Sequence, residues 1–504
     1  MRKLTKVRKP RGIRALFKAE GGTILAIWGV SLTAFLGLVA MSFDLGRINI
    51  TQTEMQSYVD HVALAAAGEL DGELDSITRA TLAANTLVSD YQTFAAGGQA
   101  LGPTDFTLTF FSELPEADTD TMTGATTNPR DAAYVRVKAV TKTVDLTFGA
   151  AFVALSGTDG PDNTITATAV AGFTQFACDV TPLMFCLPSA GYDADSNIGD
   201  MLHLRSGGQG SAWGPGDFGF LDPAKIKVDD GGPCDGLSGV QLDTCLMGAV
   251  GSITQCFSMR GVDIEPGQKV GNFEAAINVR FDIYRAVVNN KRNDPDYAPA
   301  PNVIKGIKPD TGGGNGGNAG GGNQCIGGNE TTTNDTVGLP RDTCIINGSC
   351  GRIGNGAWDR TEYVDRNYGN ANGILEAGED PHPNAGTRYE YYLAEIAAAG
   401  ANAPILTGRE ETGRPMCSVN QTNDPERRVV IAAGIDCNAN PISGAQQDVP
   451  VREFFKIFLT EPAGTDGATP PNFEIFGEVA GSAGGTGGGG IAGATFHDVV
   501  QLYR

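Results

Sequence analysis

An uncharged apolar run near the N-terminus is the feature that most constrains how this chain can fold. Residues 21–43 read GGTILAIWGVSLTAFLGLVAMSF and contain no charged side chain. A helix that crosses the ~30 Å hydrocarbon core of a bilayer needs about 20 such residues. We therefore predict a single transmembrane helix over residues 21–43, with the lipid bilayer as its first partner.

The charges on either side of this run predict the orientation of the helix. Residues 1–20 contain eight Lys and Arg residues against one acidic residue, Glu20, and Asp44 follows the run directly. Because basic residues are retained on the cytoplasmic side, residues 1–20 should form a cytoplasmic tail and everything after Asp44 should be translocated. We expect a single-pass inner-membrane protein with a cytoplasmic N-terminus and its body in the periplasm.

A cleaved signal peptide is the main alternative to a retained span. The apolar region of a signal peptide usually has ~7–15 residues and precedes a small-x-small cleavage site. Here the run is longer, and it continues directly into a helical pattern. These features favour a retained membrane anchor.

The composition of the chain limits which kinds of partner the body can bind. The 504-residue chain has a formal net charge of -21 although its first twenty residues are strongly basic, so the body is very acidic. An acidic surface repels phosphate groups, and we expect no nucleic-acid partner. Hydrophobic residues make up 41% of the chain, which is enough to build packed cores.

The cysteines point to an oxidising compartment. All ten of them follow the apolar run, and an even number in such a compartment predicts disulfide bonds. The chain has no Cys-x-x-Cys motif and only four histidines, which argues against zinc sites and thioredoxin-like chemistry. The close pairs Cys178/Cys186 and Cys344/Cys350 are candidates for local bridges, whereas the wider connectivity stays open.

The residues after the span predict an α+β body on a helical stalk. Met55, Val59 and Val62 recur at helical spacing, so the transmembrane helix should continue from residue 44 into the stalk. Residues 76–96 should extend this helical region. Alternating β-branched and aromatic residues then predict strands. These strands cover residues 106–111, 133–144 and 164–173.

Farther along, the pattern indicates a mixed, loop-rich and disulfide-bonded extracytoplasmic body. We expect a helix over residues 387–399 and strands over residues 427–433 and 454–459. Gly-rich tracts at residues 311–323 and 481–490 are typical of linkers. The predicted segments are a cytoplasmic tail (1–20), a transmembrane helix (21–43), a helical stalk (44–100), a small strand-rich module (101–177), an extracytoplasmic domain (178–310), a Gly/Asn-rich linker (311–335) and a C-terminal extracytoplasmic domain (336–504).

The order of motifs over roughly residues 14–70 resembles a known family. Phe17-Lys18 precedes a Gly pair and the span, Asp-Leu-Gly-Arg follows at residues 44–47, and a Gln-x-x-x-Asp-x-x-Ala-Leu-Ala helix covers residues 56–65. This pattern resembles the TadG-like N-terminal domain of tight-adherence (Tad, or Flp) pilus assembly proteins. Further pieces that are similar to longer TadG-type proteins lie at residues 178–184, 358–360, 387–390 and 451–462. The resemblance implies a membrane-anchored accessory of Flp pilus biogenesis, with other Tad/Flp pilus assembly proteins as partners.

One difference from the sequences of pilins indicates whether this chain is an anchor or a fibre subunit. Type IV-like pilins carry Glu at the fifth position after the processing Gly, whereas counting from Gly21 gives Ala26 and counting from Gly22 gives Ile27. A fibre subunit would be expected to keep this carboxylate, which is costly in lipid and needs a partner amine. Its absence favours an unprocessed anchor over a polymerising pilin.

The sharpest candidate for a metal site is an Asn- and Glu-containing loop in the C-terminal region. On the EF-hand template, Asn370 and Asn372 fall on positions three and five. Glu376 falls on position nine and Glu379 on the bidentate twelfth position, a spacing that suits Ca²⁺. Position one is Tyr368, which does not fit. The alternative is an Asn/Gly turn with solvated carboxylates, so calcium is a candidate cofactor only.

Motifs for catalysis are absent from the sequence. There is no Gly-x-Ser-x-Gly, no His-Glu-x-x-His and no Walker A motif, and we expect no enzyme. His203, His382 and His497 are isolated and more typical of surface or packing residues. Our first hypothesis is a membrane-anchored accessory or structural component of Flp (Tad) pilus assembly or secretion in the bacterial envelope. The alternative is a surface or periplasmic Ca²⁺-dependent binding or adhesion protein.

Overall fold

The computed structural model divides the chain into two compact units. Unit 1 contains Met1–Thr174 and Val499–Arg504, and unit 2 contains Gln175–Asp498. The boundaries between them fall within strands β7 (Thr168–Ala177) and β20 (Phe496–Leu502). The residues that the structure describes are 23–72, 74–96, 100–115, 117, 120–149, 163–178, 180–207, 212–222, 228, 231–251, 256–259, 261–265, 270–308, 331–369, 379–468, 471–483 and 496–503.

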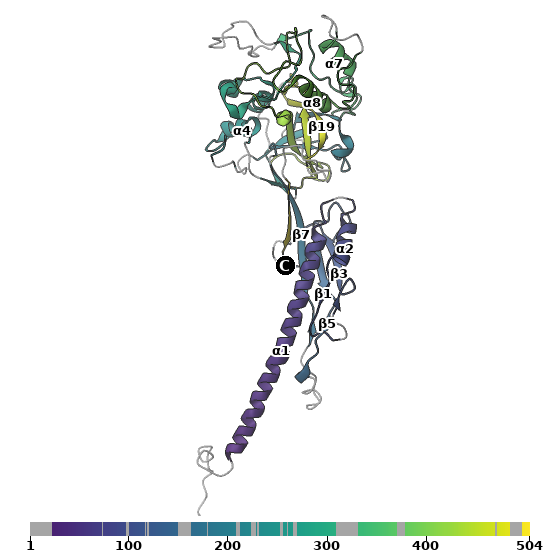
Figure 1. Ribbon diagram of the computed structural model, residues 1–504, viewed down its shortest axis with the longest axis vertical. Helices are drawn as coiled ribbons and strands as arrows, with labels where there is room; N and C mark the ends of the chain where they lie inside the picture. Colours follow the sequence, from purple (N-terminus) through teal and green to yellow (C-terminus); the bar gives the residue numbers. More distant parts are fainter. Residues whose placement is uncertain are drawn as a thin grey trace, which may run out of the picture. The chain divides into compact units, whose positions relative to one another are not determined.

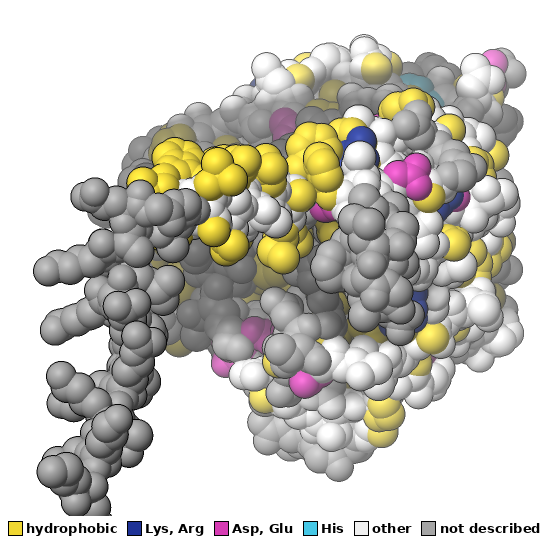
Figure 2. Space-filling view, turned by 90° about the horizontal axis from the view of Figure 1, so that it is seen from below, with side chains coloured by type: hydrophobic (Ala, Val, Ile, Leu, Met, Phe, Trp, Pro, Cys, Tyr) yellow, Lys and Arg dark blue, Asp and Glu magenta, His cyan; other side chains and the backbone are white. Residues whose placement is uncertain are grey.

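A single continuous helix, α1 (Thr23–Ala67), begins unit 1 and is the long ribbon labelled in Figure 1. Its most apolar window is not buried in the protein at all, and side chains such as Leu25 are 83% exposed. Hydrophobic side chains also gather in a band on the face shown in Figure 2. The helix is therefore long and apolar enough to cross a membrane, and the predicted continuation of the span into a helical stalk is confirmed.

The second half of α1 packs against an antiparallel sheet in unit 1. Strand β3 (Phe106–Phe111) pairs with β4 (Tyr134–Ala139), β4 pairs with β7, and β20 lies beside β7. Met55, Val59 and Val62 of α1 are at most 1% exposed and share one core cluster with valines of β4. One face of α1 and one face of the sheet therefore pack against each other, as expected when apolar residues recur at helical spacing in the helix and at every second residue in the strand.

The smaller elements of unit 1 correct one prediction. Helix α2 (Ser76–Thr86) confirms the start of the predicted helical region, but its extension to residue 96 is wrong. The chain instead enters β1 (Asp90–Tyr91), which pairs with β2 (Ala100–Leu101). The intervening Thr-Leu-Val-Ser-Asp residues are mostly β-branched or compete for backbone hydrogen bonds, which disfavours a helix.

The structure has strands in all three regions predicted for unit 1, but it divides the second and third regions into two strands each. Strand β3 covers the predicted residues 106–111, and the predicted 133–144 contains β4 and β5 (Lys142–Thr143). The predicted 164–173 contains β6 (Thr164–Ile165), which pairs with β5, and the first part of β7. The β-branched and aromatic residues of these segments were a sufficient signal, although burial does not simply alternate, because Phe111 of β3 and Val170 of β7 are buried in a second cluster apart from the one that contains α1.

Nine strands among the described residues of unit 2 form one mixed sheet in the order β16-β12-β10-β8-β15-β17-β19-β18, with β9 paired to both β10 and β19. Because of this double pairing, β8, β15, β17, β19, β9 and β10 form a closed ring, which leaves these six strands without a free edge. Strands from before and after residues 309–330 share this sheet. Their bounds are β8 (Leu183–Cys186), β9 (Met201–Ser206), β10 (Asp217–Leu221), β12 (Val262–Glu265), β15 (Val429–Ile435), β16 (Gln446–Val449), β17 (Glu453–Leu459), β18 (Gly464–Thr465) and β19 (Phe473–Ser482).

Both faces of this sheet are buried. Leu183 and Phe185 of β8 belong to one core cluster, and the intervening Met184 and Cys186 belong to another. This explains why β15 and β17 read as nearly continuous apolar runs instead of alternating ones. The strands predicted at residues 427–433 and 454–459 are confirmed, although β15 begins later because Pro425–Arg428 forms a 3₁₀ turn.

Helices and short strands complete unit 2. The predicted helix at residues 387–399 is confirmed as α8 (Arg388–Ala399), which begins with a capping box between Thr387 and Glu390. The other helices are α4 (Gly239–Gly248), α5 (Val270–Asn278), α6 (Thr343–Ile346) and α7 (Arg360–Asn367). The remaining short strands are β11 (Phe257–Ser258), β13 (Ile307–Lys308) and β14 (Thr331–Thr332).

Disulfide bonds tie unit 2 together over short and long sequence distances. Among the described residues the bridges are Cys178–Cys256, Cys186–Cys437, Cys234–Cys245 and Cys344–Cys350. The predicted bridge Cys344/Cys350 is confirmed, whereas Cys178/Cys186 is wrong. Cys186 ends β8, which runs parallel to β15, and Cys437 follows the end of β15, so the sheet brings these two residues together.

Candidate functional site at the end of the apolar helix

Asp44, the first charged residue after the apolar run, holds a distant loop of unit 1 against α1. The residue is only 7% exposed. Its carboxylate accepts hydrogen bonds from the backbone N–H groups of Thr147 at 3.1 Å, Phe148 at 3.1 Å and Gly149 at 2.6 Å. The backbone becomes helical at Thr147, so Asp44 supplies acceptors that the first N–H groups of a helix lack.

Arg47, three residues farther along α1, contacts the same loop. Its Nη1 donates to the carbonyl oxygen of Asp145 at 2.9 Å and to Oγ1 of Thr147 at 2.6 Å. The guanidinium carbon also lies 5.3 Å from the ring centroid of Phe43 and 4.6 Å from that of Phe94. These aromatic faces interact favourably with the positive charge of the partly exposed Arg47 side chain.

We call Asp44, Arg47 and residues 145–149 the exit clamp, because they lie where the apolar run ends. The buried Asp44 carboxylate accepts backbone hydrogen bonds, which compensates its burial, and the partly exposed Arg47 donates from Nη1 and lies against aromatic rings of the same unit. The arrangement fixes the strand module to the axis of α1. Its chemistry is that of attachment and positioning.

Two glutamines of α1 extend this attachment along the stalk. Nε2 of Gln56 donates to Oδ1 of Asp60 at 2.8 Å and to the carbonyl oxygen of Thr168 at 3.2 Å. Nε2 of Gln52 donates to the carbonyl oxygen of Thr166 at 2.9 Å. Gln56 of the family-like helical motif, which also donates to Asp60 of the same motif, therefore connects α1 to the start of β7.

The predicted calcium loop falls largely outside the described residues. Asn370, Asn372 and Glu376 all lie there, and Glu379 is described and exposed. Tyr368 donates its hydroxyl to Oε1 of Glu395 at 2.7 Å, so the residue at the first template position belongs to the packed interior. In the part of the chain that the structure describes, no cluster of three or more His, Cys, Asp or Glu side chains could hold a metal ion. The calcium site stays a prediction.

Two of the isolated histidines are packing residues of unit 2. Nε2 of His203 lies 2.7 Å from Oε1 of Glu474, and the ring stacks on Phe476 at 4.3 Å between centroids. The ring of His382 meets Tyr391 edge-on. Burial lowers the pKa of both histidines below the ordinary value, which favours the neutral rings.

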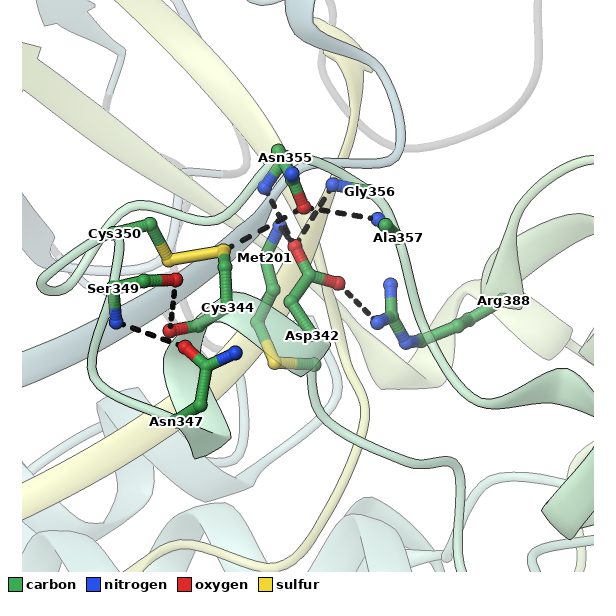
Figure 3. The surroundings of a disulfide bond; sticks show 10 residues. All are labelled: Met201, Asp342, Cys344, Asn347, Ser349, Cys350, Asn355, Gly356, Ala357 and Arg388. Carbon is green, nitrogen blue, oxygen red and sulfur yellow. Dashed lines mark hydrogen bonds and ion pairs between the residues drawn. A yellow bond between two sulfur atoms is a disulfide. The ribbon is translucent and has the colours of Figure 1, made fainter.

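Sequence reasoning missed a buried ion network in unit 2. Arg388 at the start of α8 is fully buried and donates to the carboxylates of Asp342 and Glu478, the latter at 3.0 Å. Asp342 also accepts from two backbone N–H groups at 2.7 and 2.8 Å. Figure 3 shows Asp342 between Arg388 and the turn closed by the Cys344–Cys350 disulfide. The partners lie 46 and 90 residues from Arg388, so no local pattern signals the network.

Glu395 is another buried acid of unit 2, and its pKa lies near neutral pH. Oε1 of Glu395 accepts hydrogen bonds from the hydroxyls of Tyr363 at 2.8 Å and Tyr368 at 2.7 Å. Burial raises the pKa of Glu395 to about 7, although these two hydroxyls and the nearby Arg428 oppose the shift. The group is enclosed by core side chains, so its role is in stability.

Comparison with known proteins identifies the N-terminal part of the chain. The family model described as Putative Flp pilus-assembly TadE/G-like matches residues 22–69. This range contains nearly all of the apolar run, Asp44 and Arg47 of the exit clamp, and the helical motif whose Gln56 bonds to β7. Neither the search of curated proteins nor that of solved structures returns a match. Residues 22–69 of this chain therefore form a TadE/G-like N-terminal domain, as in Flp pilus-assembly proteins.

Proposed function

We propose that this chain is a membrane-anchored accessory of Flp (Tad) pilus assembly or secretion, with a structural and not a catalytic role. The TadE/G-like match supports the link to Flp pilus assembly. The observation that carries the proposal is the exit clamp, in which Asp44 and Arg47 bind residues 145–149 at the end of the exposed apolar helix. Such a joint suits a protein that holds the strands of unit 1 at a fixed place on a membrane.

The charge distribution supports an orientation for the anchor. The basic residues before the apolar run favour a cytoplasmic N-terminus, and the acidic body would then lie in the periplasm. The disulfide bonds of unit 2 suit an oxidising compartment of this kind. Other Flp assembly proteins are the proposed partners, and the inner membrane is the proposed location.

The start of the apolar run supports an anchor in preference to a fibre subunit. Ala26 and Ile27 occupy the two positions at which a pilin would carry its Glu. In α1 the Ile27 side chain is 52% exposed, at a depth where lipid would surround it. A helix without a buried carboxylate is well suited to remain in the bilayer.

A complementation experiment tests this function. Cells that lack the chain should assemble few or no Flp pili, and the intact chain should restore them. Because Asp44→Ala removes the acceptor of the exit clamp, this variant should restore pili poorly. Asp145→Ala is the matched control, since it removes an exposed carboxylate from the same loop while keeping the backbone carbonyl that Arg47 uses. Normal piliation of cells without the chain would contradict the proposal.

A further inference from the structure

The exit clamp fixes the depth of a second apolar group relative to α1. Asp44 follows the apolar run directly, and its carboxylate binds the N–H groups of Phe148 and Gly149. The side chain of Phe148 contacts Phe43, the last residue of the apolar run, edge-on with 5.7 Å between ring centroids. If Phe43 lies at the end of a membrane span, Phe148 lies at the same depth.

Phe148 is exposed although it sits beside the core of unit 1. Its side chain is 44% exposed, close to the 52% of both Phe43 and Leu45 on α1. The neighbouring Leu146 packs partly against the core of the unit, which orients the loop. The exposed Phe148 ring therefore lies beside the apolar surface of α1 and enlarges it, although Phe148 is about 100 residues away from this part of α1 in the sequence.

We propose that residues 146–149 form a second membrane contact, in which the Phe148 ring enters the headgroup region of the bilayer beside α1. The inference rests on the proposed function, because it needs α1 to span the membrane. Aromatic rings are favoured at the boundary between lipid chains and headgroups. Lipid is the occupant because the ring is continuous with the lipid-facing surface of α1 and because the Arg47 charge lies at the same level.

A second membrane contact beside α1 would restrict motions that a single spanning helix leaves free. A single span can rotate and tilt within the bilayer, since its tilt is set by packing and by interfacial anchors. An aromatic ring held beside the span by Asp44 and Arg47 would restrict both motions. The strand module of unit 1 would then keep a fixed attitude to the membrane surface.

Tryptophan quenching in lipid nanodiscs tests the contact with the full chain. The natural Trp28 lies in the apolar run and is 70% exposed, so it reports whether α1 spans the bilayer. Phe148→Trp, built on a Trp28→Phe background, reports on the loop. The matched control is Leu74→Trp on the same background, because Leu74 is 68% exposed but follows the far end of α1. Subtracting the spectrum of the background protein removes the signal of the two remaining tryptophans.

The two reporters separate the inference from the proposed function. Lipids brominated near the headgroup should quench Phe148→Trp at least about twofold more than Leu74→Trp, whereas lipids brominated deep in the chain should quench Trp28. Equal quenching of Phe148→Trp and Leu74→Trp, with Trp28 quenched, would overturn only the second contact. A Trp28 that no brominated lipid quenches would overturn the span, and both proposals with it.

Hydroxyl-radical footprinting of the unaltered chain gives the answer if Phe148→Trp does not fold. The native Phe148 ring should be labelled at least about threefold less in nanodiscs than the exposed Tyr91 ring, because lipid excludes the water that generates radicals. Tyr91 is 57% exposed, a fraction comparable to that of Phe148. Equal labelling of the two rings, after correction for their reactivity, would overturn the inference.

Discussion

The carboxylate of Asp44 accepts a hydrogen bond of 2.6 Å from the backbone N–H of Gly149, a residue 105 positions later in the chain. This bond joins the end of the apolar run of α1 to a helical turn that lies between strands β5 and β6 of unit 1. The residues between them form the stalk and most of the strand module, so the bond closes unit 1 at its membrane end. The motif Asp-Leu-Gly-Arg thereby acquires a physical role, since its first and last residues hold the same loop.

Removal of the Asp44 carboxylate should loosen this loop without unfolding unit 1. Asp44→Ala leaves the N–H groups of residues 147–149 without their acceptor, at a cost of about 1–2 kcal/mol. Hydrogen exchange of these amides should accelerate by roughly 5–30-fold. Asp44→Asn keeps one acceptor oxygen and should show a smaller effect. Unchanged exchange in Asp44→Ala would contradict the assigned role.

Arg388, one of the buried arginines of unit 2, should contribute far more to stability than an exposed arginine. Arg388→Met leaves the carboxylates of Asp342 and Glu478 buried without their partner, which should cost about 3–5 kcal/mol in the free energy of unfolding. Arg366→Met is the control because Arg366 pairs with Glu362 on the surface of α7, where a pair contributes about 0–1 kcal/mol. Chemical denaturation of the full chain in detergent measures both. Similar losses in the two variants would exclude the buried network as a main source of stability.

Glu395 should make unit 2 more stable in mild acid than at neutral pH. Its pKa is about 7 in the folded state against an ordinary value of 4.5, so as pH rises the unfolded chain releases the proton first. The native state therefore loses stability between about pH 4.5 and pH 7, by roughly 3 kcal/mol at most.

Glu395→Gln separates this effect from other titrations. The amide keeps an oxygen for Tyr363 and Tyr368 but carries no charge. The variant should gain stability over the natural chain as pH rises from 5 to 8, measured by denaturation at a series of pH values. A constant difference between the two proteins across this range would rule out titration of Glu395.

A disulfide that closes a long loop and one that closes a short loop should contribute different amounts to the free energy of unfolding. Cys186–Cys437 closes a loop of 251 residues and Cys344–Cys350 a loop of 6. On loop-closure entropy, replacing the first pair by Ala should cost about 5 kcal/mol and the second about 2 kcal/mol. Denaturation midpoints under non-reducing conditions give the comparison. A larger loss for the short loop would show that strain or local packing outweighs chain entropy.

The parts of the fold that the sequence predicted are those decided by local patterns. Strand β3 was found at its full length because it is a run of β-branched and aromatic residues, and α8 because Thr387 and Glu390 form its capping box. The helix predicted to residue 96 stopped at Thr86, where local propensity changes. The Cys186–Cys437 bridge could not be predicted, because only the parallel pairing of β8 and β15 brings its ends together.

In the candidate site, too, the features set by local sequence could be predicted and those set by distant contacts could not. The Asp-Leu-Gly-Arg motif was visible in the sequence, and the match to residues 22–69 confirms the resemblance on which it was singled out. The contacts of the motif with residues 145–149 were not visible, since about 100 residues intervene. Arg388 likewise stood within a family-like segment, but its role as the centre of a buried ion network depends on partners in other elements.

The proposed orientation of the chain rests on the charge asymmetry around the apolar run and can be tested by proteolysis. Protease added to spheroplasts should digest units 1 and 2 and spare only the basic tail and the span. The same treatment after membrane lysis should also remove the tail. Survival of the body in intact spheroplasts would contradict a periplasmic location.

Mass spectrometry of N-terminal peptides in separated cell fractions tests most directly whether the chain is an anchor or a fibre subunit. The Gly21-Gly22 pair lies between the basic tail and the apolar run, where a prepilin peptidase could cut. An anchor needs the positive tail to hold its orientation, so peptides covering Arg2 to Lys18 should be recovered, and only from the inner-membrane fraction. A mature chain that begins at Gly22 or Thr23 and is recovered in sheared pili would contradict the anchor.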